Sequence, residues 1–321
     1  MKLSIITINY NNAEGLRRTL ASVAAQTYRD IEHIIIDGAS SDGSVDIIRD
    51  YENTIKRSVT IDQSTIQVKW LSEPDKGIYN AMNKGIEIAL GKRVVNKNHT
   101  SNITHNTSQE SLCDYVQILN SGDLLAAPDV TERMMAALHN TSNITHNTSV
   151  ENRAAILYGN MLKSYDGKTI INRDTCGNGM YTPESFLYFY KGTLNHDCAY
   201  IRRDLFDKYG LYNEEMKICS DWEWYVRAIV LGGEKPVYTN IDVTIFDMNG
   251  VSERRGKNAD IIKRERREYL EKMLPPSVLR DYDQFSFPIL QYQRLKKHHL
   301  WGIVYFIERV LFKLEKWRIL R

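Results

Sequence analysis

Two acidic clusters in the first third of the chain have the residue types and spacing to bind a nucleotide. Asp37 lies in a glycine- and serine-rich loop. A carboxylate there can accept hydrogen bonds from a base or ribose, or can simply form a turn. Asp75 and Lys76 precede a predicted helix N-terminus. A lysine beside free backbone N–H groups can hold a phosphate, and a capped helix with a solvated lysine is the alternative.

Two further carboxylates suit metal binding and base catalysis. Asp123 follows a predicted buried strand beside Gly122, where it can bind a hard cation through oxygen. One carboxylate is too few for a tight protein-only site, so a diphosphate would have to supply further oxygens. Asp221 begins a predicted helix near Trp222 and Trp224. It can act as a general base beside a sugar-binding aromatic face, or it can cap the helix.

An alternation of strands and helices positions these residues. The early strands are expected at 3–8, 34–36 and 68–71, and the early helices at 13–26, 45–51 and 78–90. The pattern predicts a mainly parallel sheet with helices on both faces, in which ligands bind beyond the carboxyl ends of the strands. Later strands are expected at 115–119, 154–159 and 236–242, and helices at 128–139, 202–209, 221–231 and 258–273.

The composition indicates a folded protein without general affinity for polyanions. The 321 residues include 42 Lys and Arg against 40 Asp and Glu, and 42% are hydrophobic. Charge near balance leaves no cation excess for nucleic acid. The four cysteines form no C-x-x-C pair, as expected for reduced thiols in a cytosol. The N-terminal MKLSIITINYNN predicts a strand rather than an export signal, so we expect a cytoplasmic protein.

A duplication interrupts the pattern. Residues 100–108 (TSNITHNTS) recur identically at 141–149. Two copies do not make a repeat fold, so we expect low-complexity surface loops inserted in a compact domain. Their N-x-[ST] matches would matter only in a secretory compartment.

Residues 290–321 differ in kind from the rest of the chain. Apolar and aromatic residues there alternate with eight basic residues, and only Glu308 and Glu315 oppose them: Arg294, Lys296, Lys297, Arg309, Lys313, Lys316, Arg318 and Arg321. We expect one amphipathic helix, which suits an anionic membrane surface. A helix packed on the domain with a solvated basic face is the alternative.

Several enzyme classes lack support. No G-x-G-x-x-G, G-x-x-x-x-G-K-[ST], H-E-x-x-H or G-x-S-x-G sequence occurs. Dinucleotide oxidoreductases, P-loop enzymes, zincins and α/β-hydrolases are therefore disfavoured. The histidines show no metal-ligand spacing.

Taken together and in this order, the clusters resemble those of the family-2 inverting glycosyltransferases of the GT-A fold. The bacterial subgroup that builds surface polysaccharides is the most similar. The segments that carry the resemblance are SIITINYN (4–11), IDGASSDG (36–43), SEPDKGIYNAMNKG (72–85), LNSGD (119–123) and CSDWEW (219–224). The resemblance implies an α/β, GT-A type nucleotide-diphospho-sugar transferase fold. This fold has a mainly parallel mixed sheet flanked by helices, here with a helical C-terminal extension.

The resemblance assigns the donor site residue by residue. Tyr10 and Asp37 match positions that contact the base and ribose of the donor, and Asp75 and Lys76 fall in its donor-binding stretch. Gly38 departs from the pattern, because many relatives carry a second aspartate there.

The resemblance also assigns the metal site and the base. Asp123 matches the last acid of the D-x-D motif, which reaches the metal and the diphosphate, although Asn120-Ser-Gly replaces the earlier acids. Asp221 matches the catalytic base. His196 resembles a polar position on the acceptor side, and a structural histidine is the alternative. We therefore expect Asp123 and Asp221 to converge at one pocket.

The implied domain organisation has four parts. Residues 1–94 would form the nucleotide-sugar-binding half, 95–114 a low-complexity insert, 115–250 the metal-site and acceptor-binding half, and 251–321 a helical extension able to associate with a membrane.

The implied function is metal-dependent, inverting sugar transfer in surface polysaccharide or oligosaccharide biosynthesis. The donor would be a nucleotide-diphosphate sugar, with a UDP-sugar favoured, the cation Mg²⁺ or Mn²⁺, and the acceptor a saccharide or lipid-linked saccharide at the inner membrane face. A nucleotidyltransferase of similar fold is one alternative, but residues 9–15 lack the Gly-rich, basic phosphate loop that it would need. A catalytically inactive, membrane-bound assembly subunit is the other.

Overall fold

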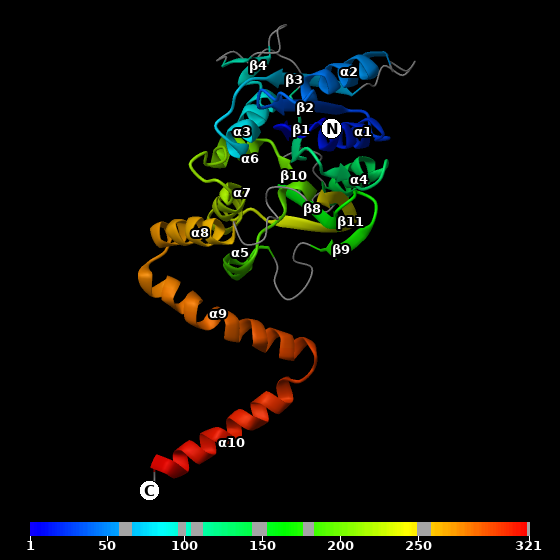
Figure 1. Ribbon diagram of the computed structural model, residues 1–321. Helices are drawn as coiled ribbons and strands as arrows, with labels where there is room; N and C mark the ends of the chain where they lie inside the picture. Colours follow the sequence, from blue (N-terminus) through cyan, green and yellow to red (C-terminus); the bar gives the residue numbers. More distant parts are fainter. Residues whose placement is uncertain are drawn as a thin grey trace.

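The computed structural model describes residues 1–57, 66–95, 101–103, 112–142, 153–175, 183–248 and 258–319. Within these ranges a nine-stranded sheet forms the centre of the molecule, with strand order β3-β2-β1-β6-β10-β8-β11-β7 and with β9 paired to β8 (Figure 1). Most of the two duplicated segments, 100–108 and 141–149, lies outside the described residues.

The first half of the chain builds the parallel part of the sheet. Its elements are β1 (Leu3–Asn9), α1 (Ala13–Ala24), β2 (Ile31–Asp37), α2 (Ser44–Arg57), β3 (Gln67–Ser72) and α3 (Ile78–Ala89). β1 pairs in parallel with β2, and β2 with β3. Every residue of β1 and β2 is buried, as expected for parallel strands that are covered by helices on both faces. The predicted alternation of strands and helices is therefore confirmed.

The second half continues the same sheet with mixed strand directions. Its strands are β6 (Tyr115–Ile118), β7 (Leu124–Leu125), β8 (Ile156–Ser164), β9 (Ile170–Asp174), β10 (Ala199–Arg202) and β11 (Pro236–Asp247), and α4 (Val130–Ser142) packs on β11. β6 runs parallel to β1, whereas β10 is antiparallel to β6 and β8. A separate pair, β4 (Arg93–Val95) and β5 (Ser101–Ile103), stands apart from the sheet.

The helix predicted at 202–209 is shorter than expected, because β10 ends at Arg202 and α6 spans Asp204–Tyr209. Four strand residues are too few to show a period in the sequence. The helix predicted at 221–231 is α7 (Ser220–Tyr225), which continues as the π-helix η3 (Val226–Leu231).

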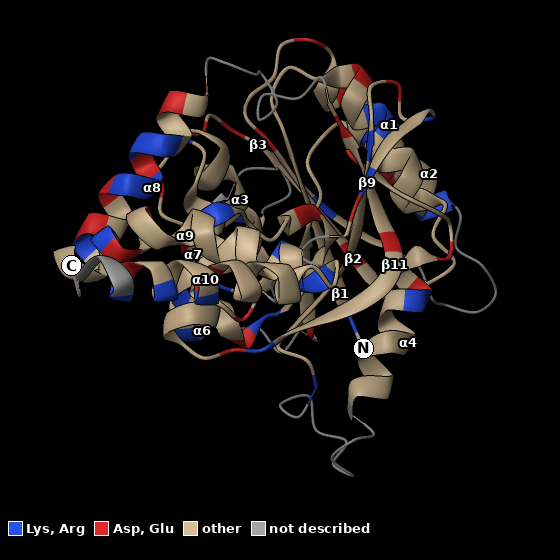
Figure 2. Ribbon diagram, turned by 90° about the horizontal axis from the view of Figure 1, so that it is seen from below, with Lys and Arg blue, Asp and Glu red and all other residues tan. Residues whose placement is uncertain are grey.

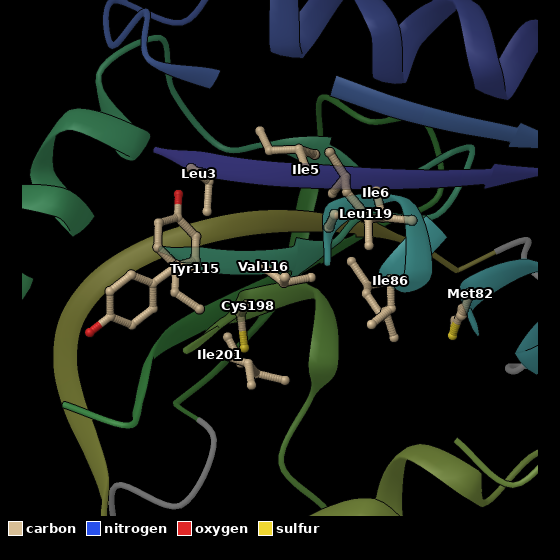
Figure 3. Close-up of a cluster of buried hydrophobic side chains, with 14 of the residues drawn as sticks. Leu3, Ile5, Ile6, Met82, Ile86, Tyr115, Val116, Leu119, Cys198 and Ile201 are labelled. Carbon is tan, nitrogen blue, oxygen red and sulfur yellow. The ribbon is translucent and has the colours of Figure 1, made fainter. Parts of the chain in front are cut away.

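Close packing of α3 on β1 fixes the strand ends that carry the candidate site. A Cβ atom at Gly85 would collide with Cγ2 of Ile6, so only glycine allows this approach. Ile6 lies near Ile86 of α3 and Leu119, which follows β6 (Figure 3). These side chains are buried, and each buried side chain of this size contributes about 1.5–3 kcal/mol to folding.

α5 (Phe186–Lys191) lies between β9 and β10, and three helices follow the last strand: α8 (Ala259–Met273), α9 (Pro276–Lys297) and α10 (Trp301–Ile319). α9 packs on α5 through the rings of Tyr282 and Phe186, whose centroids are 4.7 Å apart. α10 leads away from the rest of the molecule (Figure 1). None of the described helices has the length and apolar character needed to span a membrane.

The expectation of one helix across residues 290–321 is wrong. α9 ends at Lys297, and α10 begins at Trp301. His299 between them has φ +58°, a left-handed conformation that ends a helix in the manner of a C-terminal cap. The rings of Tyr292 and Trp301 pack across this turn with centroids 4.1 Å apart.

Candidate active site

Asp37 ties together the carboxyl ends of three strands. Its Oδ1 accepts a hydrogen bond from the side-chain amide of Asn9 at 2.8 Å, and its Oδ2 accepts from the Ser72 hydroxyl at 2.6 Å. The backbone N–H of Ser40 also donates to Oδ2, at 2.9 Å. Asp37 is fully buried, so both of its oxygens serve to fix the edge on which the other candidate donor residues lie.

Tyr10 and Asp75 meet at Gly38. A Cβ atom on Gly38 would lie 2.5 Å from Oδ2 of Asp75 and 3.1 Å from Cδ2 of Tyr10. Glycine at this position, in place of the aspartate of the family pattern, therefore leaves room for these two side chains. Tyr10 is 67% exposed, so its ring and the neighbouring carboxylate are available to a flat, hydrogen-bonding ligand. Lys76 is exposed next along the chain.

Asp123 is a buried carboxylate beside other carboxylates. Its Oδ1 accepts a hydrogen bond from the backbone N–H of Asp247 at 2.9 Å. Burial, and then the charge of Asp197, raise the pKa of Asp123 well above its ordinary value. Burial likewise raises the pKa of Asp197, whose Oδ2 accepts from the Thr244 hydroxyl at 2.9 Å. The electrostatics at Asp123 therefore favour a bound positive charge.

The residues at Asp123 fit a divalent cation only in part. Oxygen ligands are those that Mg²⁺ and Mn²⁺ prefer. Within the described ranges, however, no group of three or more His, Cys, Asp or Glu side chains could hold a metal ion. A cation at Asp123 therefore needs further oxygens from a ligand such as a diphosphate.

Asp221 is held by a network of side chains from separate parts of the chain. Its Oδ2 lies 3.0 Å from Nδ1 of His196, in the 3₁₀-helix η2 (His196–Cys198), and Nε2 of His196 lies 3.1 Å from the side-chain nitrogen of Asn120. The Tyr79 hydroxyl is 2.5 Å from the Ile218 carbonyl oxygen and 3.2 Å from Oδ1 of Asp221. Two distant parts of the chain thus contact this carboxylate, and a third, Asn120, contacts it through His196.

His196 and Asp221 form an ion pair. Burial alone would lower the pKa of His196, but the hydrogen bond and charge of Asp221, with the charges of Asp197 and Asp123, raise it to about 9. Burial alone would raise the pKa of Asp221, but the hydrogen bond and charge of His196 lower it. A charged imidazole donates from both nitrogens. Rotating the Asn120 amide by 180° would turn Oδ1 of Asn120 toward Nε2 of His196 as a hydrogen-bond acceptor. This oxygen is otherwise buried without a partner among the described residues.

A cavity of about 220 Å³ opens beside this network, and Asp221, His196, Asp197 and Asn120 line it. Among the described residues that form its wall, Asp123 is absent. Asp123 nevertheless lies three residues beyond Asn120, and its charge acts on His196. The structure thus brings Asp221 into the cavity wall, whereas Asp123 lies outside the described lining and acts on His196 through its charge.

The stretch 72–85, for which a donor-binding role is predicted, also makes structural contacts. Besides Tyr79, its Asn83 side chain donates to the backbone carbonyl of Tyr212 at 2.9 Å, and Lys84 pairs with Glu73 at 2.9 Å. The stretch therefore joins the first half of the chain to the segment that precedes Asp221. Sequence reasoning missed Tyr79, although it lies within a quoted segment.

Glu265 was also missed. α8 carries alternating acidic and basic residues (Figure 2), but Glu265 is buried. Its carboxylate accepts three consecutive backbone N–H groups, those of Lys217 at 2.7 Å, Ile218 at 3.1 Å and Cys219 at 3.0 Å. It therefore fixes the loop just before Asp221. Nothing in the charged pattern of residues 258–273 distinguishes it from its neighbours.

Comparison with known sequences supports the family resemblance. Residues 4–96 match the family model for Glycosyl transferase family 2. An uncharacterized glycosyltransferase of Mycobacterium tuberculosis is 28% identical over 260 residues, 80% of this chain and 79% of that protein. A PGL/p-HBAD biosynthesis glycosyltransferase of the same species is 24% identical, over 70% of this chain and 68% of that protein.

Solved structures share the fold. The mannosyltransferase PcManGT from Pyrobaculum calidifontis, in complex with GDP-Man and Mn²⁺, has a TM-score of 0.53 at 17% identity, over 94% of this chain and 72% of that chain. S. aureus TarS 1-349, in complex with UDP-GlcNAc, has a TM-score of 0.51 at 16% identity, over 77% of this chain and 58% of that chain. The predicted GT-A fold and the resemblance to family 2 are confirmed.

We predict that His196 makes the stability of the ligand-free protein depend on pH. Because folding raises its pKa from 6.5 to about 9, its stabilising contribution is complete below about pH 6.5 and is lost as the pH rises through about 9. The free-energy difference between the natural protein and His196→Gln should shrink by on the order of 1–3 kcal/mol over that range.

Urea unfolding at pH 6.5 and at about pH 9.5 measures this difference. His298→Gln, which removes an exposed imidazole at the end of α9, is the matched control. A difference between the natural protein and His196→Gln that does not change with pH would contradict the ion pair.

Proposed function

Because the chain carries a family-2 glycosyltransferase domain of the GT-A fold, we propose that it moves a sugar from a nucleotide-diphosphate donor to a hydroxyl acceptor, with inversion at the anomeric carbon. The product would belong to a surface polysaccharide or oligosaccharide. One observation carries the proposal. Asp221 lies in the wall of a cavity, ionised and oriented by His196, as a general base for a hydroxyl must be.

The donor would bind at the carboxyl ends of β1, β2 and β3. The exposed ring of Tyr10 would pack on the base, and the carboxylate of Asp75 would accept its N–H groups. Uracil presents such a donor at N3, as the proposed UDP-sugar requires. The solved neighbours named above were studied with UDP-GlcNAc and with GDP-Man, so both base types occur on this fold.

Asp123 would hold Mg²⁺ or Mn²⁺ together with the diphosphate of the donor. When bound, the cation would stabilise the negative charge that develops on the leaving diphosphate. The fit rests on oxygen chemistry and on the burial of Asp123 near the charge of Asp197, which together favour a bound positive charge. The Mn²⁺ in the complex of PcManGT lends support by analogy.

Asp221 would take the proton of the acceptor hydroxyl as its oxygen attacks the anomeric carbon. The bond from that carbon to the diphosphate breaks on the opposite face, which accounts for inversion. Since Oδ2 of Asp221 faces His196 and the Tyr79 hydroxyl is closer to the Ile218 carbonyl, Oδ1 keeps a lone pair for the incoming proton. The lowered pKa of Asp221 keeps it ionised at neutral pH.

We further propose that α10 binds an anionic membrane surface. Six apolar residues recur at helical spacing along one side of α10, and all are exposed: Ile303, Phe306, Ile307, Val310, Leu311 and Leu314. We call this set the apolar stripe. At 100° per residue, Arg309, Lys313 and Lys316 fall together beside it. An apolar stripe bordered by cations suits a helix that lies in the interface of a membrane with anionic lipids.

The transfer function is tested by comparing a variant of the proposed base, Asp221, with a variant of the proposed metal-binding residue, Asp123. We predict that Asp221→Asn lowers the rate of sugar transfer by at least about 100-fold but leaves Mn²⁺-dependent UDP binding unchanged. Asp123→Asn should instead weaken that binding, because it removes the carboxylate proposed to reach the metal. Calorimetric titration with UDP and Mn²⁺, and a transfer assay with a panel of nucleotide sugars, measure the two effects.

Asp129→Asn, an exposed carboxylate before α4, is the matched control. A fully active Asp221→Asn variant would refute the assignment of the base. Transfer of a nucleotidyl group instead of a sugar, or no transfer at all with any donor, would favour one of the two alternative functions.

Binding to vesicles tests the membrane proposal. We predict that the full chain sediments with phosphatidylglycerol vesicles and that Phe306→Ser with Leu314→Ser weakens binding by at least about tenfold, because two inserted side chains of the apolar stripe are lost. Tyr305→Ser with Phe312→Ser is the control, since both rings are exposed on the other side of α10. Equal binding of the stripe variant would overturn the proposal, as would concentration-dependent dimerisation that only this variant abolishes.

A further inference from the structure

The cavity beside Asp221 has walls of two different kinds. One kind is apolar and comprises Ile78, Met82, Met161, Phe246 and Ile262. The other is cationic and comprises Lys163, Lys217 and Arg266. Asp221 already has His196 as its cationic partner. The ion pair therefore does not account for three further cations in the cavity wall.

The three cations are poorly neutralised by the protein. Lys217 is exposed, and no carboxylate of the described residues pairs with it or with Arg266. The Arg266 guanidinium lies 5.0 Å from the ring centre of Trp222, and its buried Nε has no hydrogen-bond partner within the described part of the chain. Nζ of Lys163 lies 4.0 Å from Oδ2 of Asp174, which is a long distance for an ion pair.

The acids of the cavity do not cancel this charge. The Asp221 carboxylate is paired with His196, and Oδ2 of Asp197 accepts a hydrogen bond from the Thr244 hydroxyl. These two acids face His196 and three further cations in the lining. The cavity therefore carries a surplus of positive charge next to the carboxylate that would accept the proton of the acceptor.

We propose that this cavity binds an acceptor that carries an anionic group, with its reacting hydroxyl at Asp221 and its anion against Lys217 and Arg266. The inference rests on the transfer function proposed above and names the class of its acceptor. The planar guanidinium of Arg266 suits the oxygen pairs of carboxylates and phosphates alike. The apolar wall would cover the carbon face of the sugar or its aglycone.

The test uses three probes that share one ring and one aglycone: phenyl glucoside, phenyl glucuronide and phenyl glucoside 6-phosphate. Each is titrated calorimetrically into the full chain with UDP and Mn²⁺ already saturating, so that the donor site is occupied. We expect at least one charged probe to bind about tenfold more tightly than the neutral one, as for a charge-assisted contact. The preference between the two charged probes identifies carboxylate or phosphate as the group recognised.

Lys217→Gln should reduce this advantage, and Lys217→Gln with Arg266→Gln should abolish it. Because Lys217 is exposed, its single variant keeps the test valid if the double variant is unstable. Lys235→Gln, an exposed lysine outside the cavity lining, should keep the full advantage.

Equal affinity for neutral and charged probes, binding of none of them, or an advantage that survives in Lys217→Gln with Arg266→Gln would overturn the proposal. The two proposals can fail separately. If UDP does not bind but the charged probes still discriminate, the transfer function falls and the anion site stands.

Discussion

The ion pair between His196 and Asp221 is the interaction on which the rest of the site depends. Both side chains are largely buried, and a buried pair is tolerated only when further hydrogen bonds satisfy both partners. Asn120 contacts the imidazole from the loop after β6, and Tyr79 lies beside the carboxylate from α3. Removing one partner of such a pair leaves an unpaired buried charge, at a cost of about 3–5 kcal/mol. The fold must therefore hold η2, α7, α3 and the loop after β6 in fixed positions relative to one another.

This requirement explains the mixed sheet and the role of the helical extension. β10, antiparallel to β6 and β8, follows directly from η2 and so places His196 beside β6, within reach of Asn120. On the other side of the cavity, Glu265 of α8 binds the backbone of the loop before Asp221. The extension thus contributes to the candidate active site at α8, whereas α10 at its far end presents an exposed apolar stripe.

Much of the fold was predictable because buried parallel strands leave a strong signal. The β-branched runs at 3–8 and 34–36 became β1 and β2, and the rule that ligands bind at the carboxyl ends of such strands pointed to Tyr10, Asp37 and Asp75. Other features leave no local signal. The four residues of β10 are too short to show a period, and Glu265 is one acid among many in a charged helix. The break at His299 depends on a backbone conformation that the amphipathic pattern of residues 290–321 does not record. The roles of Asp123 and Asp221 came from the family resemblance and stay predictions, since the matched family model ends at residue 96.

The central claim is that one continuous site joins a diphosphate-binding carboxylate to a base across the sheet. A crystal structure of the full chain grown with UDP and Mn²⁺ tests it most directly, because the anomalous signal of manganese locates the metal without ambiguity. We expect Mn²⁺ on Asp123, the uracil ring against Tyr10, and the terminal phosphate directed toward the cavity that Asp221 lines. Manganese bound away from Asp123, or a diphosphate on the far side of the sheet from Asp221, would contradict it.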